Sequence, residues 1–153
     1  MIKKYLIILI GCCIAFNLQS NSFKYKIPKF MSNSEPTPEL VYHCAKHYGL
    51  SHLNVVVAQS ILESGHYKYH KNNNLFGLYD SKNKQYYKFN TWQESVKAYK
   101  DKVQYRYKTG DYYKFLNNYA EDPNYINKVK SIEKRYEKDW NNFSSNYSRD
   151  YWQ

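Results

Sequence analysis

The strongest constraint on how this chain folds is a pair of adjacent, helix-patterned apolar stretches between residues 37 and 65. The first has Thr37 as its N-cap, Pro38 at the first helical position and Gly49 just past its end. Its apolar face comprises Leu40, Val41, Cys44, Ala45 and Tyr48. The second begins at about Ser51 and stops at Gly65, and its inward residues are Leu53, Val56, Val57, Ser60 and Ile61. This spacing predicts two consecutive helices that bury one face each.

The rest of the chain predicts further helices and one small hairpin. Strand-like runs at 75–80 and 85–90 flank a turn-like segment at 81–84. Thr91 and Glu94 form a T-x-x-E capping box that opens a helix ended by Gly110, with an inward stripe of Trp92, Val96, Tyr99 and Val103. A short helix is expected over about 111–119. The last begins with Asp122 as cap and Pro123 at the first position, and buries Tyr125, Val129, Ile132 and Tyr136. We expect one mainly α (α+β) domain.

The first residues have the layout of an export signal. Lys3 and Lys4 precede an apolar run that is too short to span a bilayer, which takes about 20 residues. The tetrapeptide LIGC ending at Cys12 resembles the lipobox of bacterial lipoproteins, so we expect lipidation at Cys12; an ordinary cleaved leader is the alternative. Either predicts an exported protein, and the lipid anchor predicts a membrane-attached protein of the cell envelope. The expected divisions are a leader at 1–16, a tether at 17–36, a folded domain at 37–140 and a polar tail at 141–153.

The net positive charge favours an anionic partner, and the many tyrosines favour a partner whose rings or apolar faces can stack on them. The chain has a formal net charge of +10 and contains 19 tyrosines, whose rings offer platforms for sugars, bases or proteins. The basic, tyrosine-rich stretch at 99–108 admits nucleic-acid binding. The leader argues against that interpretation, and so does the core spacing of Val96, Tyr99 and Val103. We therefore expect no nucleic-acid partner.

Glu63 is the candidate general acid. It lies in the last turn of the second helix, where the negative end of the helix dipole disfavours a carboxylate. Its neighbours Ile61 and Leu62 suggest an apolar setting, so both effects predict a raised pKa. A carboxylic acid kept neutral near physiological pH can protonate a leaving glycosidic oxygen. The alternative is a solvated glutamate at a frayed helix end.

Several motifs around Glu63 occur together in an informative order. They are AQSILESG at 58–65, NNLFGLY at 73–79, FNTWQESVKAY at 89–99 and YAEDPNY at 119–125. Together they resemble the bacterial glucosaminidase family that cuts peptidoglycan, glycoside hydrolase family 73, over roughly residues 40–136. The resemblance implies a lysozyme-like fold, a helical body with a small β-lobe and a cleft between them. It also implies that Glu63 is the catalytic acid, that Tyr119 lies beside it, and that a groove is lined by Asn74, Leu75, Phe76 and Gly77.

The resemblance leaves the second catalytic group open. Many relatives carry a further acid on a longer β-lobe, whereas Asp80 is the only acid between Ser64 and Gln93 here. Asp80 is a candidate base, and equally a turn former. Without a base, the 2-acetamido group of the substrate would attack, with Tyr119 steadying charge or positioning water. Asn74 is expected to bond an N-acetyl group, and Phe76 and the hairpin tyrosines Tyr79, Tyr86 and Tyr87 are expected to stack on sugar faces. Tyr125 is also expected to bind substrate.

Other functions compete with an exported endo-β-N-acetylglucosaminidase that cleaves between N-acetylglucosamine and N-acetylmuramic acid. A lytic transglycosylase needs one acid and yields 1,6-anhydro-muramoyl ends. A wall-binding module without catalysis is a third hypothesis. Glu63 and His66 form E-x-x-H, and His43 and His47 lie one turn apart, but the spacing lacks a full ligand set. We expect neither a metal nor another cofactor, and expect the lone Cys44 of the folded part to be a buried structural thiol.

Overall fold

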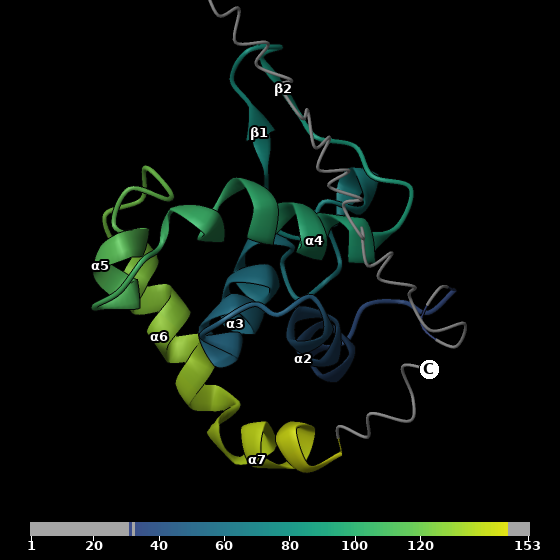
Figure 1. Ribbon diagram of the computed structural model, residues 1–153, viewed down its shortest axis with the longest axis vertical. Coiled ribbons are helices and arrows are strands. Elements are labelled where there is room, and N and C mark those ends of the chain that lie inside the picture. Colours follow the sequence, from purple (N-terminus) through teal and green to yellow (C-terminus); the bar gives the residue numbers. More distant parts are fainter. Residues whose placement is uncertain (1–30, 32, 147–153) are drawn as a thin grey trace, which may run out of the picture.

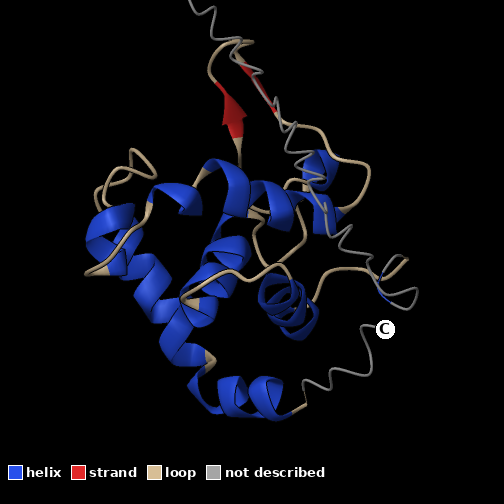
Figure 2. Ribbon diagram, in the orientation of Figure 1, coloured by secondary structure: helices blue, strands red, loops and turns tan. Residues whose placement is uncertain are grey.

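The computed structural model describes residues 31 and 33–146. The expected leader with Cys12, residues 17–30 of the expected tether, and residues 147–153 lie outside the described residues. Within the described part, a helical body carries one small antiparallel hairpin, which projects from the top in Figures 1 and 2. This arrangement confirms the expected mainly α (α+β) fold and is consistent with a lysozyme-like architecture.

The helical body is built from six α-helices in the described residues. They are α2 (Pro38–His47), α3 (Leu53–Glu63), α4 (Trp92–Lys102), α5 (Tyr112–Leu116), α6 (Tyr125–Arg135) and α7 (Glu137–Ser145). Two short 3₁₀ turns, η1 (Lys71–Asn73) and η2 (Gln104–Arg106), connect them. The hairpin strands are β1 (Tyr79–Asp80) and β2 (Gln85–Tyr86). The strands are therefore shorter than the runs expected from sequence.

Helix α3 lies at the centre of the body and packs against α2 and α6 (Figure 1). All seven residues from Val55 to Ile61 are buried, including Gln59 and Ser60. A helix buried on every side lacks the narrow apolar stripe of a surface helix. On α2, the predicted face is confirmed except for the half-buried Leu40, and Cys44 is 1% exposed. The buried helix α3 ends at Glu63.

The ends of the helices follow the predicted caps in part. Thr37 Oγ1 accepts a hydrogen bond from Leu40 N, and Thr91 Oγ1 accepts one from Glu94 N, as expected. The second half of the capping box differs, because the Glu94 carboxylate accepts from Asn90 N instead of from Thr91 N. The first turn of α4 is thus held from one residue further upstream than predicted.

Helix α4 ends well before Gly110, where its end was expected. Its last residue is Lys102, and η2 follows. The side chain of Gln104 explains the change, because Oε1 accepts from Ser51 N while Nε2 donates to Ser51 O, both at 2.9 Å. This pair of bonds fixes the chain after α4 against the start of α3 and turns it out of the helix.

The last helices also depart from the expected pattern. Helix α6 begins at Tyr125 and not at Pro123, because Asp122 Oδ1 accepts from Asn124 N and Asp122 O accepts from Tyr125 N, which makes a turn first. Helix α7 crosses the expected domain end at residue 140. Trp140 is buried, and its ring stacks 6.4 Å from that of Tyr42. Residues 141–145 therefore belong to the folded body.

The end of the expected tether also packs on the core. Met31 is fully buried, and its carbonyl accepts a hydrogen bond from the Gln93 side chain. Trp92 Nε1 donates to Ser34 O at 2.7 Å. The folded body thus includes Met31, six residues before Thr37. Among the described residues, no helix is long and apolar enough to cross a membrane.

The hairpin is fixed to the body by Asn74. Its strands pair Tyr79 with Tyr86 and Asp80 with Gln85. Asn74 Nδ2 donates to Leu78 O at 2.9 Å and to Tyr87 O at 3.2 Å, and Asn74 Oδ1 accepts from Leu78 N at 2.9 Å. One buried amide side chain therefore joins both ends of the hairpin.

We expect Asn74→Ala to destabilise the fold by about 3 kcal/mol, because three hydrogen bonds are lost and the buried Leu78 N–H loses its acceptor. Urea unfolding followed by circular dichroism measures this change. Asn83→Ala is the matched control, since the exposed Asn83 side chain bonds only the Asp80 carboxylate; its cost should stay under about 1 kcal/mol. Equal losses in the two variants would contradict the assigned role of Asn74.

Candidate functional site

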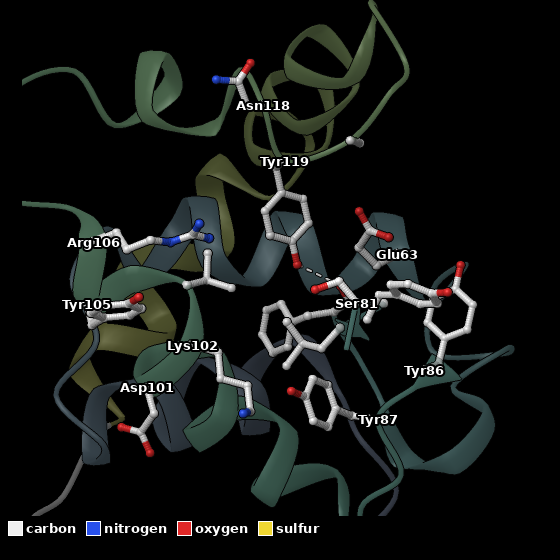
Figure 3. A pocket seen from close by; sticks show the side chains of 16 residues that line it. Glu63, Ser81, Tyr86, Tyr87, Asp101, Lys102, Tyr105, Arg106, Asn118 and Tyr119 are labelled. Atoms are coloured by element: carbon white, nitrogen blue, oxygen red, sulfur yellow. Dashed lines mark hydrogen bonds between the residues drawn. The ribbon is translucent and has the colours of Figure 1, made fainter. Parts of the chain in front are cut away.

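Two open cavities meet at Glu63 on the side of the body that carries the hairpin. The larger is about 690 Å³ and runs between the hairpin, the end of α4, η2 and the segment after α5. The smaller is about 330 Å³ and includes residues of η1. Glu63, Gly77 and Tyr86 line both cavities. The site is thus a groove that continues on both sides of one carboxyl group, and Figure 3 shows its larger part.

The Glu63 carboxyl group is half-buried at the C-terminal end of α3. Burial raises its pKa above the usual value, and a hydrogen bond with the Tyr125 hydroxyl opposes part of that rise. The predicted direction of the shift is confirmed. A solvated glutamate at a frayed helix end does not match this environment, because the side chain lies between Gly77 and the tyrosines.

Gly77 provides the space that the Glu63 carboxyl group occupies. A Cβ atom at this position would lie 2.9 Å from Glu63 Oε2. The backbone of Gly77 also has φ +59°, a conformation that disfavours other residues. Two separate constraints therefore require glycine at this position of the NLFG motif: the positive φ angle and the close approach of the Glu63 carboxyl group.

Two stacked tyrosines lie beside Glu63, and Tyr125, which was expected to bind substrate, is 5% exposed, lines neither cavity and does not offer its ring to a sugar. The rings of Tyr119 and Tyr125 are 5.6 Å apart at an interplanar angle of 25°. Tyr119 lines the larger cavity and donates its hydroxyl hydrogen to Phe76 O at 2.7 Å. Burial raises the pKa of both hydroxyls, first among the causes, and the nearby Glu63 charge raises them further. Both tyrosines are therefore protonated at neutral pH, and Tyr119 holds the peptide that precedes Gly77.

A buried series of hydrogen bonds runs from Gln104 in η2 to Tyr125 in α6. Gln104 Nε2 donates to the Tyr112 hydroxyl at 2.9 Å, and the hydroxyls of Tyr112 and Tyr99 are 3.0 Å apart. Tyr99 donates to Gln59 Oε1 at 2.6 Å. Gln59 Nε2 donates to the Tyr125 hydroxyl at 3.1 Å. Sequence reasoning did not assign a role to Gln59, although it stands in the AQSILESG motif.

In this series of hydrogen bonds, each group donates to the next one on the way to Tyr125 and Glu63. The single hydroxyl hydrogen of Tyr99 goes to Gln59, so Tyr112 must donate to Tyr99. Tyr125 accepts from Gln59, and its own hydrogen is left for the carboxyl group of Glu63. Hydrogen bonds in such a chain polarise one another. The Tyr125 hydroxyl is thus oriented as a donor to the Glu63 carboxylate.

Phe76 lines the larger cavity and Asn74 the smaller one, as expected, but their side chains also serve the fold. Leu75 and Phe76 are fully buried, and the Phe76 ring lies 4.4 Å from that of Tyr99. The Phe76 ring is therefore not available to stack on a sugar. Asn74 is 7% exposed, and its amide bonds the hairpin backbone, so it does not offer that amide to an N-acetyl group.

Asp80 does not line either cavity that contains Glu63. Its Oδ1 accepts from Lys82 N and Asn83 N, and its Oδ2 accepts from Asn83 Nδ2 at 2.7 Å. The Asn83 side-chain bond is the main cause of its lowered pKa. Asp80 instead borders a separate cavity on the hairpin. The structure therefore favours the turn-former interpretation of Asp80 over the catalytic one.

Exposed tyrosines border the groove. Tyr79 and Tyr86 are 50% and 60% exposed, and their rings meet edge to face at 5.2 Å. Sequence reasoning expected rings from this hairpin but did not single out Tyr69, which is 78% exposed at the smaller cavity, or Tyr105, which is 60% exposed at the larger one. Lys102 and Arg106 at the larger cavity were also missed, because their stretch was weighed only against nucleic acid.

The described residues contain no group of three or more histidine, cysteine, aspartate or glutamate side chains placed to hold a metal ion. His66 has φ +59° and follows the end of α3, so it does not continue the helical spacing from Glu63. Glu63 and His66 therefore do not form the paired ligands that the E-x-x-H spacing would give on one helix.

Comparison with known proteins identifies the domain at the level of a family. Residues 38–138 match the glucosaminidase family model, described as mannosyl-glycoprotein endo-beta-N-acetylglucosaminidase. The match runs from the start of α2 into α7 and includes Glu63, Gly77, Tyr119 and Tyr125. No curated protein and no solved structure matches the chain.

We expect Tyr125→Phe to raise the pKa of Glu63 further, because the hydrogen bond that stabilises the carboxylate is lost while its burial remains. Titration of the Glu63 carboxyl carbon by NMR measures the shift. Tyr113→Phe is the matched control, since Tyr113 donates to the carboxylate of Glu133 instead. A Glu63 pKa that is unchanged or lower in Tyr125→Phe would contradict the direction of the hydrogen-bond chain.

Proposed function

The chain belongs to the glucosaminidase family, and from this premise we propose that it is a peptidoglycan hydrolase with Glu63 as its general acid. The bond cleaved in this proposal is the β-1,4 link between N-acetylglucosamine and N-acetylmuramic acid. The observation that carries the proposal is the half-buried Glu63 carboxyl group at the junction of two open cavities.

The shape of the groove supports cleavage within a glycan strand. Sugar units of a strand can continue from Glu63 into either cavity, whereas a pocket closed on one side would accept only a chain end. Exposed tyrosine rings border both cavities, and such rings stack on the apolar faces of sugars. The formal net charge of +10 supports a polymer that carries carboxylates, as peptidoglycan does.

In the proposed reaction, protonated Glu63 gives its hydrogen to the glycosidic oxygen as the bond from that oxygen to C1 breaks. The carbonyl oxygen of the substrate's 2-acetamido group forms the new bond to C1, which yields an oxazolinium ring and a free hydroxyl on the departing sugar. The Glu63 carboxylate then takes a proton from the water that attacks C1. This step restores the acetamido group and the acid form of Glu63, with retention at C1.

Attack by the substrate's own 2-acetamido group is supported by the positions of the other carboxylates near the groove. Inverting hydrolysis uses a second carboxyl group about 6.5–9.5 Å from the first. Asp80 forms the hairpin turn outside these cavities. Asp101 borders the larger cavity, but it pairs with Lys97 at 2.5 Å and lies across the cavity from Glu63 in Figure 3. Neither acid is placed as the base of an inverting pair.

The neighbours of Glu63 act in this proposal by positioning. Tyr125 donates to the carboxylate formed when Glu63 has given up its proton. Tyr119 fixes Phe76 O and so the peptide that places Gly77 against Glu63. Because its hydrogen is used there, the Tyr119 oxygen offers an acceptor to the larger cavity, for an amide N–H or a water.

A lytic transglycosylase is the second candidate, and the same shortage of a base favours it. In that reaction Glu63 protonates the leaving oxygen as its bond to C1 breaks, and the C6 hydroxyl of the same N-acetylmuramic acid then attacks C1 while the Glu63 carboxylate takes the hydroxyl proton. The product is a 1,6-anhydro-muramoyl end in place of a reducing N-acetylglucosamine end. The family match favours the hydrolase, and the identity of the new ends distinguishes the two reactions.

We also propose export and a lipid anchor at Cys12. The support is the order of basic residues, apolar run and LIGC tetrapeptide at the start of the sequence. A second support is the groove itself, since peptidoglycan lies outside the cytoplasm. Anchoring would leave the residues between Cys12 and Met31 to link the membrane to the folded body.

We expect Glu63→Gln to lower peptidoglycan cleavage by about a hundredfold or more, because the amide cannot donate a proton to the leaving oxygen. Mass spectrometry of the released fragments gives both the rate and the end groups. Reducing N-acetylglucosamine ends support the hydrolase, and anhydro-muramoyl ends support the transglycosylase. Glu121→Gln is the control, since Glu121 is exposed in the neighbouring YAEDPNY motif. Full activity in Glu63→Gln would contradict the assignment of Glu63 as the acid, whereas a folded parent that cuts no wall would leave only a binding role.

We expect Gly77→Ala to lose activity beyond its loss of stability. The new methyl group pushes the Glu63 carboxyl group away, and a misplacement of about 1 Å can cost about a hundredfold in rate. Gly110→Ala is the control, because Gly110 has φ +96° but no atom within 4 Å of the point where the added methyl group would lie. Both variants should lose about 1 kcal/mol of stability through backbone strain. Equal activity in the two variants would contradict the proposed role of Gly77.

We expect the full chain, expressed in bacteria with labelled palmitate, to incorporate the label through Cys12. The Cys12→Ala variant should carry no label, whereas Cys13→Ala should keep it because the lipobox ends at Cys12. Label that persists in Cys12→Ala would contradict the anchor and favour an ordinary cleaved leader.

A further inference from the structure

The larger cavity has a basic end that the proposed acid chemistry does not use. Lys102, the last residue of α4, and Arg106, the last residue of η2, line the cavity together with Glu63. In Figure 3 both side chains lie on the side of Tyr119 opposite to Glu63, and the Arg106 guanidinium is directed toward the Tyr119 ring. Arg106 is close enough to Tyr119 that its charge lowers the pKa of the tyrosine hydroxyl, against the larger effect of burial.

Neither cation forms an ion pair within 4 Å in the described part of the chain, although the charge of Lys102 is among the causes of the lowered Asp80 pKa. The ion pairs found there join other groups, and the nearest acid in sequence, Asp101, is paired with Lys97. The Lys102 ammonium lies 4.4 Å above the centre of the Tyr87 ring. A cation held over an aromatic face keeps its charge available for a ligand while its position is restricted.

The surroundings of these cations suit an anion with a planar head. A guanidinium group presents parallel N–H donors that match the two oxygens of a carboxylate, and the lysine adds a second charge. Lys102 and Arg106 are exposed, so a ligand in the cavity can reach both charges, and the cavity walls beside them contain Tyr87 and the 60% exposed Tyr105.

We propose that Lys102 and Arg106 form a carboxylate subsite that binds the acid groups carried by the glycan strand. The inference rests on the proposed function, because it assigns these cations to the same groove as Glu63. Peptidoglycan supplies such acids as the lactyl carboxylate of a muramic acid that carries no peptide, or as the carboxylates of the peptide where one is attached. The enzyme therefore selects an acid-bearing strand over a neutral polymer of N-acetylglucosamine.

The position of the subsite sets its effect on kinetics. It lies across Tyr119 from the acid, so it contacts the substrate away from the bond that breaks. A contact of this kind is made equally in the ground state and the transition state, and its loss raises KM with kcat nearly unchanged. A role in folding or in tuning Glu63 would instead change kcat or the pH profile.

The test compares Lys102→Gln and Arg106→Gln on three forms of one glycan preparation. The first form keeps its peptides, the second has them removed by an amidase, and the third has its carboxylates converted to neutral amides. Each variant should raise KM about tenfold on acid-bearing strands, as expected for loss of one charged hydrogen bond. Neither should change KM on the amidated strand. The matched controls are Arg135→Gln and Lys138→Gln, which change exposed cations that border neither groove cavity.

The outcomes separate the sources of the acid and the ways in which the proposal fails. An effect only on the amidase-treated strand, where removal of the peptide frees the lactyl carboxylate from its amide bond, identifies the lactyl carboxylate. An effect only with peptides present identifies the peptide acids, and an effect on both forms identifies a subsite that accepts either acid. Equal losses on all three strands, or no loss on any, would overturn the subsite. Binding of the three strands, measured by sedimentation with the wild type and both variants, gives an answer without cleavage. If the parent cuts nothing, the proposed function fails. The binding data then decide the subsite alone: binding that depends on the acids and on these two cations supports it, and binding that depends on neither overturns it.

Discussion

The placement of the Glu63 carboxyl group between the end of a buried helix and the backbone of Gly77 governs the rest of the site. Burial raises its pKa, and burial follows from the central position of α3 in the helical body. The approach of Gly77 leaves no room for a Cβ atom. The helical core and the segment that leads into the hairpin therefore meet at the Glu63 carboxyl group, which is the proposed proton donor.

The polar residues of the core support the same arrangement. Gln59 is fully buried in α3, and its amide joins Tyr99 on α4 to Tyr125 on α6. Gln104 extends the chain of hydrogen bonds to the loop that precedes α3. A buried polar group without partners would cost stability, whereas each of these side chains has partners. The core thus links the three helices around the site and orients the Tyr125 hydroxyl at the same time.

Sequence reasoning succeeded where a local pattern has one structural solution. The Thr37–Pro38 start of α2, the end of α3 at Glu63 and the raised Glu63 pKa follow from spacing and from helix ends. It was wrong where distant contacts decide. Phe76 turned inward because Tyr99 offers it a partner from α4, and α4 ends early because Gln104 bonds Ser51, about fifty residues upstream. The basic end of the groove was missed because Lys102 and Arg106 gain meaning only from the cavity they share with Glu63.

The dependence of kcat/KM on pH, measured beside an NMR titration of Glu63 in the free protein, tests the central claim most directly. If protonated Glu63 is the acid, kcat/KM falls as the pH rises through the Glu63 pKa, because that parameter reports the free enzyme. The account predicts that the basic limb coincides with the Glu63 titration, above the ordinary range for a glutamate. A value of kcat/KM that stays constant while Glu63 ionises would contradict it.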